Sequence, residues 1–344
     1  MAVTFEFEVC ADFHFAKAFG EQFGIKAIND RVQLPDMLGD GFIQEVYLNN
    51  GLYLCVHKYV LKQELILKRK VSAFSVALTM KFDCRRIPAK TNGTITESLF
   101  KNPKGCEVEF GTANFFTELT IPANQIILFM VIGTERATIG KLIKSGLEDV
   151  PIEQMISSNK YFVFHERMTL DMERALKHLS VIEPTTQLSH LLYDAKTLEL
   201  IYLLFSKLLS RDTKQTVFVN PEDAAIIYSI RTEILKDFSV TPDLPKLAAQ
   251  ASMSQSKLKQ LFSQIFGKSI YNYFQAERMD EAAFLLNQFT VSEVGYKVGF
   301  SNLSHFTRLF EKHHSIKPKK YKDSLKQASE NDKYAFNFNH NFSP

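Results

Sequence analysis

A unit of two short helices joined by a tight turn occurs twice in the last third of this chain. The first copy spans 244–266 and the second spans 291–310. In both, apolar residues recur at helical spacing, and the second helix carries the same kind of apolar pair, Leu261–Phe262 and Leu309–Phe310. Two such helices, the second with a polar outer face, are typical of a helix-turn-helix. Because the unit occurs only twice, we expect one duplicated domain and not a solenoid.

Residues that favour helix ends flank these helices. A polar side chain before a helix accepts hydrogen bonds from its first amide groups, and glycine readily adopts the left-handed conformation that ends one. The expected caps are Asp243, Ser254, Thr290 (in a capping box with Glu293) and Ser301, and the expected end is Gly267. A further helix, over 270–286, separates the copies. We expect it to hold them at a spacing that suits successive major grooves.

The second helix of each copy is expected to turn a polar face outward. In the first copy this face comprises Gln255, Ser256, Lys257, Lys259 and Gln260. In the second copy it comprises Asn302, Leu303, Ser304, Thr307 and Arg308. Such side chains on a single helix are usually only solvated, but their repetition on two equivalent helices favours contact with DNA.

The region 227–325 resembles the DNA-binding domain of the AraC/XylS family. The matching residues are Leu247–Ala248, Met253–Ser254, Leu258, Leu261–Phe262, Phe266–Gly267, Ser269, Arg278–Met279, Ala283, Leu285–Leu286, Val298–Ser301, Ser304, Phe306, Leu309–Phe310, Pro318 and Tyr321. One departure is Ser315, where the family usually has glycine, and this affects only the local helix end. The resemblance implies an all-helical domain, over 226–328, with two recognition helices that bind double-stranded DNA.

The resemblance also implies roles for individual side chains. The expected base contacts are Ser256, Lys259, Gln260, Asn302, Leu303, Ser304, Thr307 and Arg308. Arg308 suits a guanine edge, Gln260 an adenine and Leu303 a thymine methyl group. The expected phosphate contacts are Lys257, Lys317, Lys319, Lys320 and Lys322. The chain is therefore expected to be a sequence-specific transcription regulator, and an activator that contacts RNA polymerase, as is more common in the family.

The region before Gly133 has a residue pattern typical of a β-sheet protein. Short runs rich in β-branched and aromatic residues alternate with turn signals, which suggests a barrel or a sandwich. The runs are 3–9, 42–48, 52–61, 64–67, 71–80 and 125–132. Helical spacing follows at 139–147 and 168–179. The fold class expected for the whole chain is multidomain α+β, with a β-rich sensor and dimerisation domain over 1–210 followed by the all-α domain.

A long helix is expected over 188–209, with apolar residues at three- and four-residue steps. The same stripe would suit packing against the β-rich domain or pairing with a second subunit in a homodimer, and the sequence leaves both open. We expect a polar linker over 211–225, a further helix from about Pro221 to Phe238 with proline in its first turn, and a disordered, Asn-rich tail over 329–344.

Two short segments, Leu38–Phe42 and Asp194–Leu200, resemble the sensor part of siderophore-responsive regulators of the PchR type. This resemblance implies a small-molecule effector, with a siderophore as one class. Two alternatives remain. The N-terminal domain could only dimerise or bind a protein partner, or it could be an enzyme fused to a DNA-binding domain. The sequence has no G-x-S-x-G, Walker or H-E-x-x-H motif, so we expect no enzyme activity, cofactor or metal.

The distribution of charge agrees with a division into an N-terminal domain and a C-terminal DNA-binding domain. From Arg231 to the end there are 16 Lys and Arg and 11 Asp and Glu, a net charge of +5; the totals of 41 and 38 leave 25 and 27 before that point, a net charge of −2. A basic C-terminal part suits a polyanionic partner. Cys10, Cys55, Cys84 and Cys106 form no C-x-x-C pair, and we expect reduced thiols in a soluble, cytoplasmic protein without a membrane segment.

Overall fold

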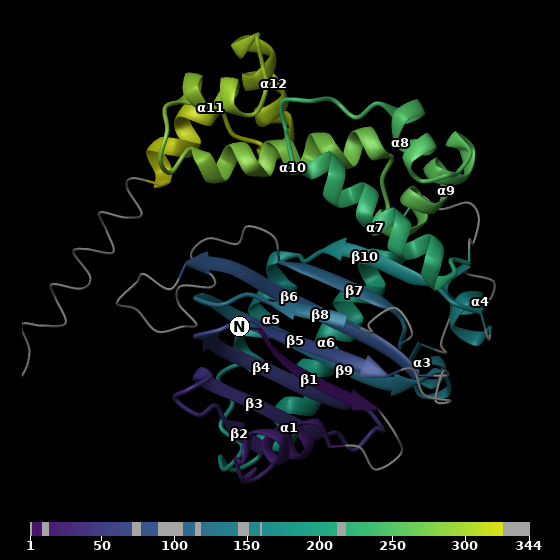
Figure 1. The fold of residues 1–344 in the computed structure, drawn as a ribbon, viewed down its shortest axis with the longest axis vertical. Coiled ribbons are helices and arrows are strands. Elements are labelled where there is room, and N and C mark those ends of the chain that lie inside the picture. The colour runs from purple at the N-terminus through teal and green to yellow at the C-terminus, as the bar shows by residue number, and fades with distance from the viewer. Residues whose placement is uncertain are drawn as a thin grey trace, which may run out of the picture. The chain divides into compact units, whose positions relative to one another are not determined.

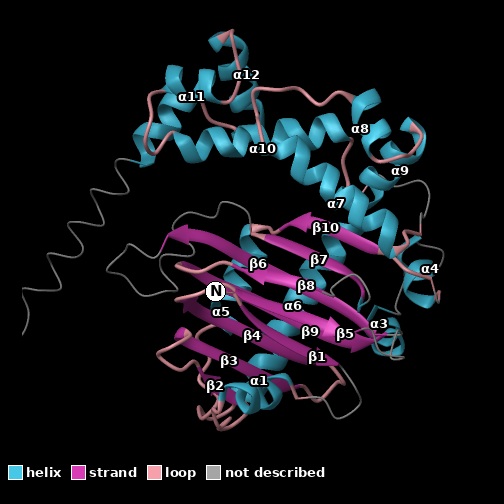
Figure 2. Cartoon of the chain, viewed as in Figure 1, coloured by secondary structure: helices cyan, strands magenta, loops and turns pink. Residues whose placement is uncertain are grey.

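The computed structural model describes residues 2–8, 14–70, 77–88, 106–113, 118–143, 151–158, 160–211 and 218–325 (Figure 1). Its contacts divide the chain into two compact units. The first unit is Met1–Ala225 together with Gln260–Gly267, and the second is Ile226–Lys259 together with Lys268–Pro344. The first is rich in strands and the second is helical (Figure 2), which confirms the expected fold class. The expected tail over 329–344 lies outside the described residues.

Two sheets form the centre of the first unit. The larger is antiparallel, in the order β10-β7-β6-β9-β4-β3-β2. Its strands are β2 (Arg31–Gln33), β3 (Gly39–Tyr47), β4 (Tyr53–Leu61), β6 (Ala77–Pro88), β7 (Glu107–Thr112), β9 (Gln125–Glu135) and β10 (Val163–Arg167). The smaller has the order β1-β5-β8, with β1 (Val3–Glu8) parallel to β5 (Leu65–Lys70) and β8 (Glu118–Ile121) antiparallel to it.

The two sheets pack on each other as a sandwich. Phe5 of the smaller sheet and Ile43, Tyr59 and Phe129 of the larger one lie in a single buried cluster. Helix α1 (Phe15–Phe23) adds Phe19 to this cluster. The structure thus answers the question left open by the sequence, because in the described residues the larger sheet ends in separate edge strands, β10 and β2, and does not close into a barrel.

Helices cover the other face of the larger sheet. They are α3 (Arg136–Ile143), α4 (Pro151–Ser157), α5 (Leu170–Leu179) and α6 (Ser189–Leu209), and Figure 1 shows α5 and α6 crossing behind the strands. Leu54 and Phe110 of the sheet share a buried cluster with Leu200 and Leu204 of α6. Burial of this apolar surface fixes α6 on the sheet, and it confirms the long helix that the sequence predicted.

Helix α6 is apolar on a second side as well. Leu188 just before the helix, and Leu191, Leu198 and Tyr202 within it, are 71%, 64%, 37% and 69% exposed. They follow one another at steps of three, seven and four residues, so they form one stripe along the helix. The two uses of the helix that the sequence left open therefore involve different sides of it: one is packed on the sheet and the other faces outward.

The N-terminus of α1 is capped from a neighbouring strand. His14 precedes the helix but makes no side-chain capping hydrogen bond. The buried carboxylate of Glu45, on β3, instead accepts hydrogen bonds from the amides of Phe15 (2.7 Å) and Ala16 (2.8 Å) and from the hydroxyl of Tyr53 (2.6 Å). Burial raises the pKa of Glu45, and these hydrogen bonds oppose the rise. A buried carboxylate thereby joins a strand to a helix.

The expectation of reduced thiols was wrong for two cysteines. Cys84 on β6 and Cys106 just before β7 form a disulfide. The sequence places them 22 residues apart, but the antiparallel pairing of Asp83 with Glu107 sets the two cysteines side by side. Cys55, on β4, is a buried free thiol.

The second unit consists of helices around a small aromatic core. Helix α7 (Pro221–Leu235) begins at the proline where the sequence predicted a helix, inside the stretch 211–225 that was also assigned to the linker. It is followed by α8 (Leu244–Gln250), α9 (Gln255–Phe266), α10 (Ile270–Leu285), α11 (Val291–Lys297) and α12 (Leu303–His314). The part of α9 from Gln260 onward belongs to the first unit. Met279, Val294, Phe306 and Phe310 form a buried cluster between α10, α11 and α12. Across the ranges that the structure describes, no helix is long and apolar enough to cross a membrane.

Candidate nucleic-acid interface

The first helix-turn-helix consists of α8 and α9, and its helix ends confirm the expected caps. The carboxylate of Asp243 accepts a hydrogen bond from the amide of Lys246 (3.2 Å), and the hydroxyl of Ser254 accepts one from the amide of Lys257 (3.2 Å). Gly267 ends α9 with φ of 67°, in the left-handed region that suits glycine. Local sequence therefore sets both the beginning and the end of α9.

Helix α9 separates apolar from polar residues as its spacing predicts. The buried side comprises Leu258, Leu261, Phe262 and Ile265. The candidate contact residues Ser256, Lys257, Lys259 and Gln260 are all exposed. The arrangement leaves the first turns of α9 open to a ligand, and two lysines give this face a positive charge.

The carboxyl end of α9 is held by an arginine that the sequence analysis did not single out. Gln260–Gly267 belong to the first compact unit, and within it the guanidinium of Arg211 donates to the carbonyl oxygens of Gln264 (2.7 Å) and Ile265 (3.0 Å). It also donates to the carboxylate of Glu166 (2.6 Å). The last carbonyls of a helix lack partners within it, and a cation there also complements the helix dipole. No local motif could have indicated a contact across about fifty residues.

The second helix-turn-helix consists of α11 and α12. Thr290 and Glu293 form the predicted capping box: the hydroxyl of Thr290 accepts from the amide of Glu293 (3.3 Å), and the carboxylate of Glu293 accepts from the amide of Thr290 (2.8 Å). The expected cap of α12, Ser301, was wrong. Asn302 is the cap, and its side-chain oxygen accepts from the amides of Ser304 (3.0 Å) and His305 (3.1 Å). The helix begins one residue later than expected because asparagine caps at least as well as serine.

Arg278 and Gly299 fix the turn of the second helix-turn-helix. Arg278, on α10, is only 6% exposed; it donates to the carbonyl oxygen of Val298, and its guanidinium lies 3.8 Å from the ring centroid of Phe300. Gly299 has φ of 81°, and a Cβ atom there would lie 2.3 Å from the Cα atom of Ser239. A side chain at Gly299 would therefore force the turn to rearrange. Loss of the Arg278 side chain would do the same.

The candidate contact residues on α12 differ in exposure. Ser304 and Arg308 are exposed, whereas Leu303 and Thr307 are half-buried. Leu303 packs closely on Gly295 of α11, where an added Cβ would lie 2.5 Å from it. The side-chain oxygen of Asn302 already binds two backbone amides. Arg308 and Ser304 are thus the most accessible members of this set.

The lysines that follow α12 also divide into two groups. Lys317, Lys319 and Lys320 are exposed at the beginning of the helical stretch 318–325. The ammonium group of Lys322 instead donates to the carbonyl oxygen of Phe289 (2.6 Å) and is half-buried. The first three are open to phosphate groups, while Lys322 ties this stretch to the loop before α11.

The chain was compared with protein families, curated proteins and solved structures. Residues 247–324 match the family model described as a helix-turn-helix domain. The chain is 29% identical over 147 residues to the transcriptional activator AggR of Escherichia coli, which covers 41% of this chain and 54% of that protein. It is 27% identical over 142 residues to the xylose operon regulatory protein of Escherichia coli K12, which covers 40% of this chain and 35% of that protein.

A solved structure is also similar to part of the chain. It is an AraC-type transcriptional regulator from Chromobacterium violaceum, 21% identical, with a TM-score of 0.29, and the match covers 31% of this chain and 96% of that one. The chain thus spans about half or less of the length of the two curated relatives given above. Both of these relatives are named as regulators and neither as an enzyme.

Proposed function

The C-terminal part of this chain carries a helix-turn-helix domain of the AraC type, and from that premise we propose that the protein is a DNA-binding transcription regulator. The observation that carries the proposal is the shared layout of α9 and α12. Each is a capped, twelve-residue helix with a buried apolar side and an exposed polar side in its first turns. This is the layout of a helix that enters the major groove.

The exposed side chains supply both parts of DNA recognition. Lys257, Lys317, Lys319 and Lys320 bind phosphate groups, which gives affinity that falls with salt. Ser256, Lys259, Gln260, Ser304 and Arg308 face base edges, which gives specificity. Arg308 has the planar fork that reads guanine, so it makes the strongest single contribution to sequence preference.

Replacement of Arg308 tests this assignment. Arg308→Ala should weaken binding to a selected site by about 1–3 kcal/mol and relax the preference at one base pair. Arg174→Ala is the matched control, because Arg174 is an exposed arginine on α5 of the first unit whose side chain is 74% exposed. A uniform loss on all sequences would make Arg308 a phosphate contact. Equal binding by the Arg308 variant and the control would remove α12 from the interface.

We propose further that the protein is a homodimer joined through α6. The outward stripe at Leu188, Leu191, Leu198 and Tyr202 continues to Leu209, which is 40% exposed. The spacing of this stripe is that of a coiled-coil seam, and a contiguous exposed apolar surface favours association. A second copy of the same helix supplies a matching stripe.

The oligomeric state tests the seam. The double substitution Leu191→Glu with Tyr202→Glu places charges on residues that are already exposed, so the fold is retained while pairing is lost. Sedimentation should show a dimer for the parent and a monomer for this variant. Leu170→Glu is the control, since Leu170 is 65% exposed on α5, and it should remain dimeric. A parent that stays monomeric at micromolar concentration would contradict the seam.

The first unit is proposed to bind a small-molecule effector between its two sheets. His57, on β4, is 2% exposed, its ring stacks on Phe129 with centroids 3.9 Å apart, and its Nδ1 atom makes no hydrogen bond within the described residues. Burial lowers the pKa of His57 to about 3, so the ring is neutral and offers a donor or an acceptor. A buried polar atom without a partner is a position that a ligand group can satisfy.

Effector dependence tests this part of the proposal. DNA affinity should change when the correct effector is added, and iron-loaded siderophores are the first class to try. His57→Phe keeps the stacked ring but should abolish the change without altering DNA affinity in the absence of effector. If no compound alters DNA affinity, the first unit serves dimerisation or a protein partner. As an activator, the cytoplasmic regulator would also contact RNA polymerase, whichever role the first unit has.

A further inference from the structure

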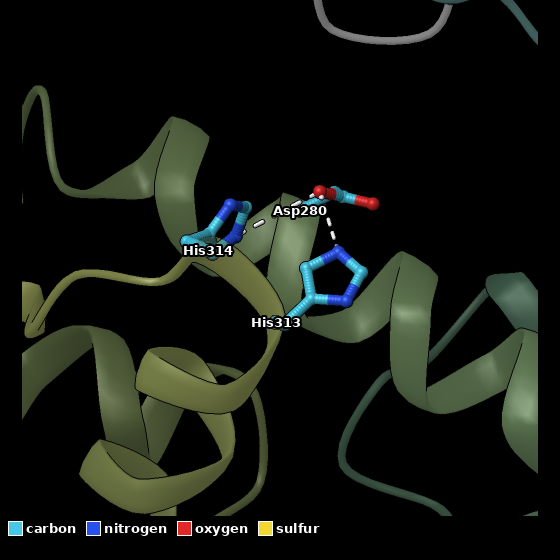
Figure 3. Close-up of side chains that lie close together, drawn as sticks. All are labelled: Asp280, His313 and His314. Carbon is cyan, nitrogen blue, oxygen red and sulfur yellow. Dashed lines mark hydrogen bonds and ion pairs between the residues drawn. The ribbon is translucent and has the colours of Figure 1, made fainter.

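Three side chains that commonly bind transition metals lie together where α12 ends beside α10 (Figure 3). Asp280 comes from α10, and His313 and His314 are the last two residues of α12. Atom Nε2 of His313 lies 3.1 Å from Oδ1 of Asp280, and Nε2 of His314 lies 3.7 Å from the same oxygen. The sequence predicted no metal site because Asp280 precedes the histidines by more than thirty residues and no short motif links them.

The spacing of these atoms suits a metal ion. Zn²⁺ binds histidine nitrogen and carboxylate oxygen at about 2.0–2.2 Å in tetrahedral geometry, which separates neighbouring ligand atoms by about 3.3–3.6 Å. The two nitrogen–oxygen distances of 3.1 and 3.7 Å bracket that range, and all three ligand atoms lie within 4.8 Å of one another. The donor atoms thus already lie at separations close to those of a zinc site.

The surrounding core holds the three residues in place. Met279 and Phe310 lie in the buried cluster between α10 and α12, and each is within four residues of a ligand. The ring of His314 packs against Phe310 and Tyr321, with centroids 4.4 and 5.7 Å apart. The side chains of Asp280, His314 and His313 are 14%, 18% and 29% exposed. The cluster is thus preorganised and partly shielded, yet open to an ion from solvent.

Two nitrogens and one oxygen favour a particular class of ion. Imidazole suits Zn²⁺, Cu²⁺ and Ni²⁺, whereas Mg²⁺ and Ca²⁺ prefer sites built from oxygen atoms. Atom Nε2 of His314 also lies 3.1 Å from the carbonyl oxygen of Met279. A metal requires the lone pair of that nitrogen, so metal binding at His314 moves the ring proton to Nδ1 and replaces this hydrogen bond.

We propose that Asp280, His313 and His314 form a binding site for a divalent transition metal of the zinc class, with water in the fourth position. The bound ion joins the end of α12 to α10 and stabilises the folded domain, because the unfolded chain does not hold these three ligands together. A change in DNA affinity on metal binding also follows, and only this consequence rests on the proposed function.

Metal binding to the full chain without DNA tests the site. Co²⁺ serves as a spectroscopic probe and Zn²⁺ as its competitor. The parent should bind one Co²⁺ per chain, with a visible absorption band typical of four-coordinate cobalt that Zn²⁺ removes, and its thermal unfolding midpoint should rise with Zn²⁺. Asp280→Asn and His313→Gln should each weaken binding about tenfold or more, since loss of even an outer-shell partner of a metal ligand costs about 10–100-fold.

Two further variants keep the test specific. His305→Gln is the matched control, because His305 is an exposed histidine at the other end of α12, and it should bind metal like the parent. His314→Phe retains a ring against Phe310 and Tyr321 but lacks the nitrogen, so it should fold and lose the metal. Parent protein without a cobalt band, or Asp280 and His313 variants that bind like the parent, would overturn the site.

DNA titrations with and without Zn²⁺ then separate the two proposals. Metal binding that disappears in the Asp280 and His313 variants establishes the site whether or not the protein binds DNA. A chain that binds metal through these residues and does not select any DNA would contradict the proposed function alone.

Discussion

The guanidinium of Arg211 lies 2.6 Å from the carboxylate of Glu166 and simultaneously caps the carboxyl end of α9. Both side chains are largely buried, at 5% and 14% exposed, and Lys207 lies 3.5 Å from the second carboxylate oxygen. The guanidinium also lies 4.8 Å from the ring centroid of Phe164. One arginine thus forms an ion pair with a buried carboxylate, donates hydrogen bonds to two helix carbonyls and lies close to an aromatic ring.

Removal of this arginine should be costly. Arg211→Met leaves Glu166 partly unpaired and removes the donor to three backbone carbonyls, those of His165, Gln264 and Ile265, and we expect it to lower the free energy of unfolding by about 3 kcal/mol. Arg174→Met removes an exposed arginine that pairs with Asp171 at 3.0 Å, and it should cost less than about 1 kcal/mol. Urea unfolding followed by circular dichroism compares the two. Equal effects would show that the buried network adds nothing to stability.

Gly299 should tolerate no side chain. Its φ of 81° and the 2.3 Å approach to the Cα atom of Ser239 combine left-handed strain with a backbone clash, so Gly299→Ala should cost more than about 2 kcal/mol. Gly140→Ala is the control, because Gly140 lies in helix α3 and an added Cβ meets nothing within 4 Å. That change should stabilise by about 0.5–1 kcal/mol. The prediction fails if both variants unfold at the same urea concentration.

Ser315 is a site where stability can be gained. It ends α12 with φ of 58°, a conformation that is costly for serine and free of strain for glycine. Ser315→Gly should therefore raise the free energy of unfolding by about 1 kcal/mol. Ser229→Gly, at an exposed position inside α7, should lower it by about 0.5 kcal/mol. Changes of the same sign in both variants would contradict this account of the helix end.

The contribution of Glu173 to stability should fall between mildly acidic and neutral pH. This residue of α5 is 9% exposed, and burial raises its pKa from 4.5 to about 7, against a smaller lowering by Arg167. Between these two values the folded protein holds a proton that the unfolded chain releases, so the part of the free energy of unfolding that Glu173 contributes decreases as pH rises through this window.

The substitution Glu173→Gln removes the titrating carboxyl group and keeps the size of the side chain. The variant should be more stable than the parent above neutral pH, by on the order of 1–2 kcal/mol, and this difference in the free energy of unfolding should grow as the pH rises from about 4.5 to 7. Thermal unfolding across this range measures both. A variant with the same slope as its parent would assign the pH dependence to other groups.

Features of the fold that depend on neighbouring residues could be predicted from the sequence. The caps at Asp243, Ser254 and Thr290 and the left-handed end at Gly267 each depend on a few consecutive residues, and the structure confirms all four. The same holds for strands with clear alternation, such as β1. The wrong prediction of the cap of α12 also has a local cause, because Ser301 and Asn302 are adjacent and both residue types can cap a helix.

Features that depend on long-range pairing could not be predicted. The disulfide between Cys84 and Cys106 requires the register of β6 on β7, and β10 lies between the two stretches, 139–147 and 168–179, for which helices were predicted. The Arg211 contacts and the Asp280 cluster each join residues that are distant in sequence and lie on different helices or loops. No spacing rule connects such residues, because the tertiary packing alone brings them together.

The central claim is that α9 and α12 read DNA sequence, and selection of genomic fragments tests it most directly. Purified protein would be mixed with fragmented genomic DNA from its own source at two salt concentrations, and the bound fragments sequenced. We predict enrichment of short direct or inverted sites upstream of genes, with log affinity falling with log salt at a slope of about −5 to −9. Binding that is indifferent to sequence, both alone and with candidate effectors and Zn²⁺ present, would contradict the claim.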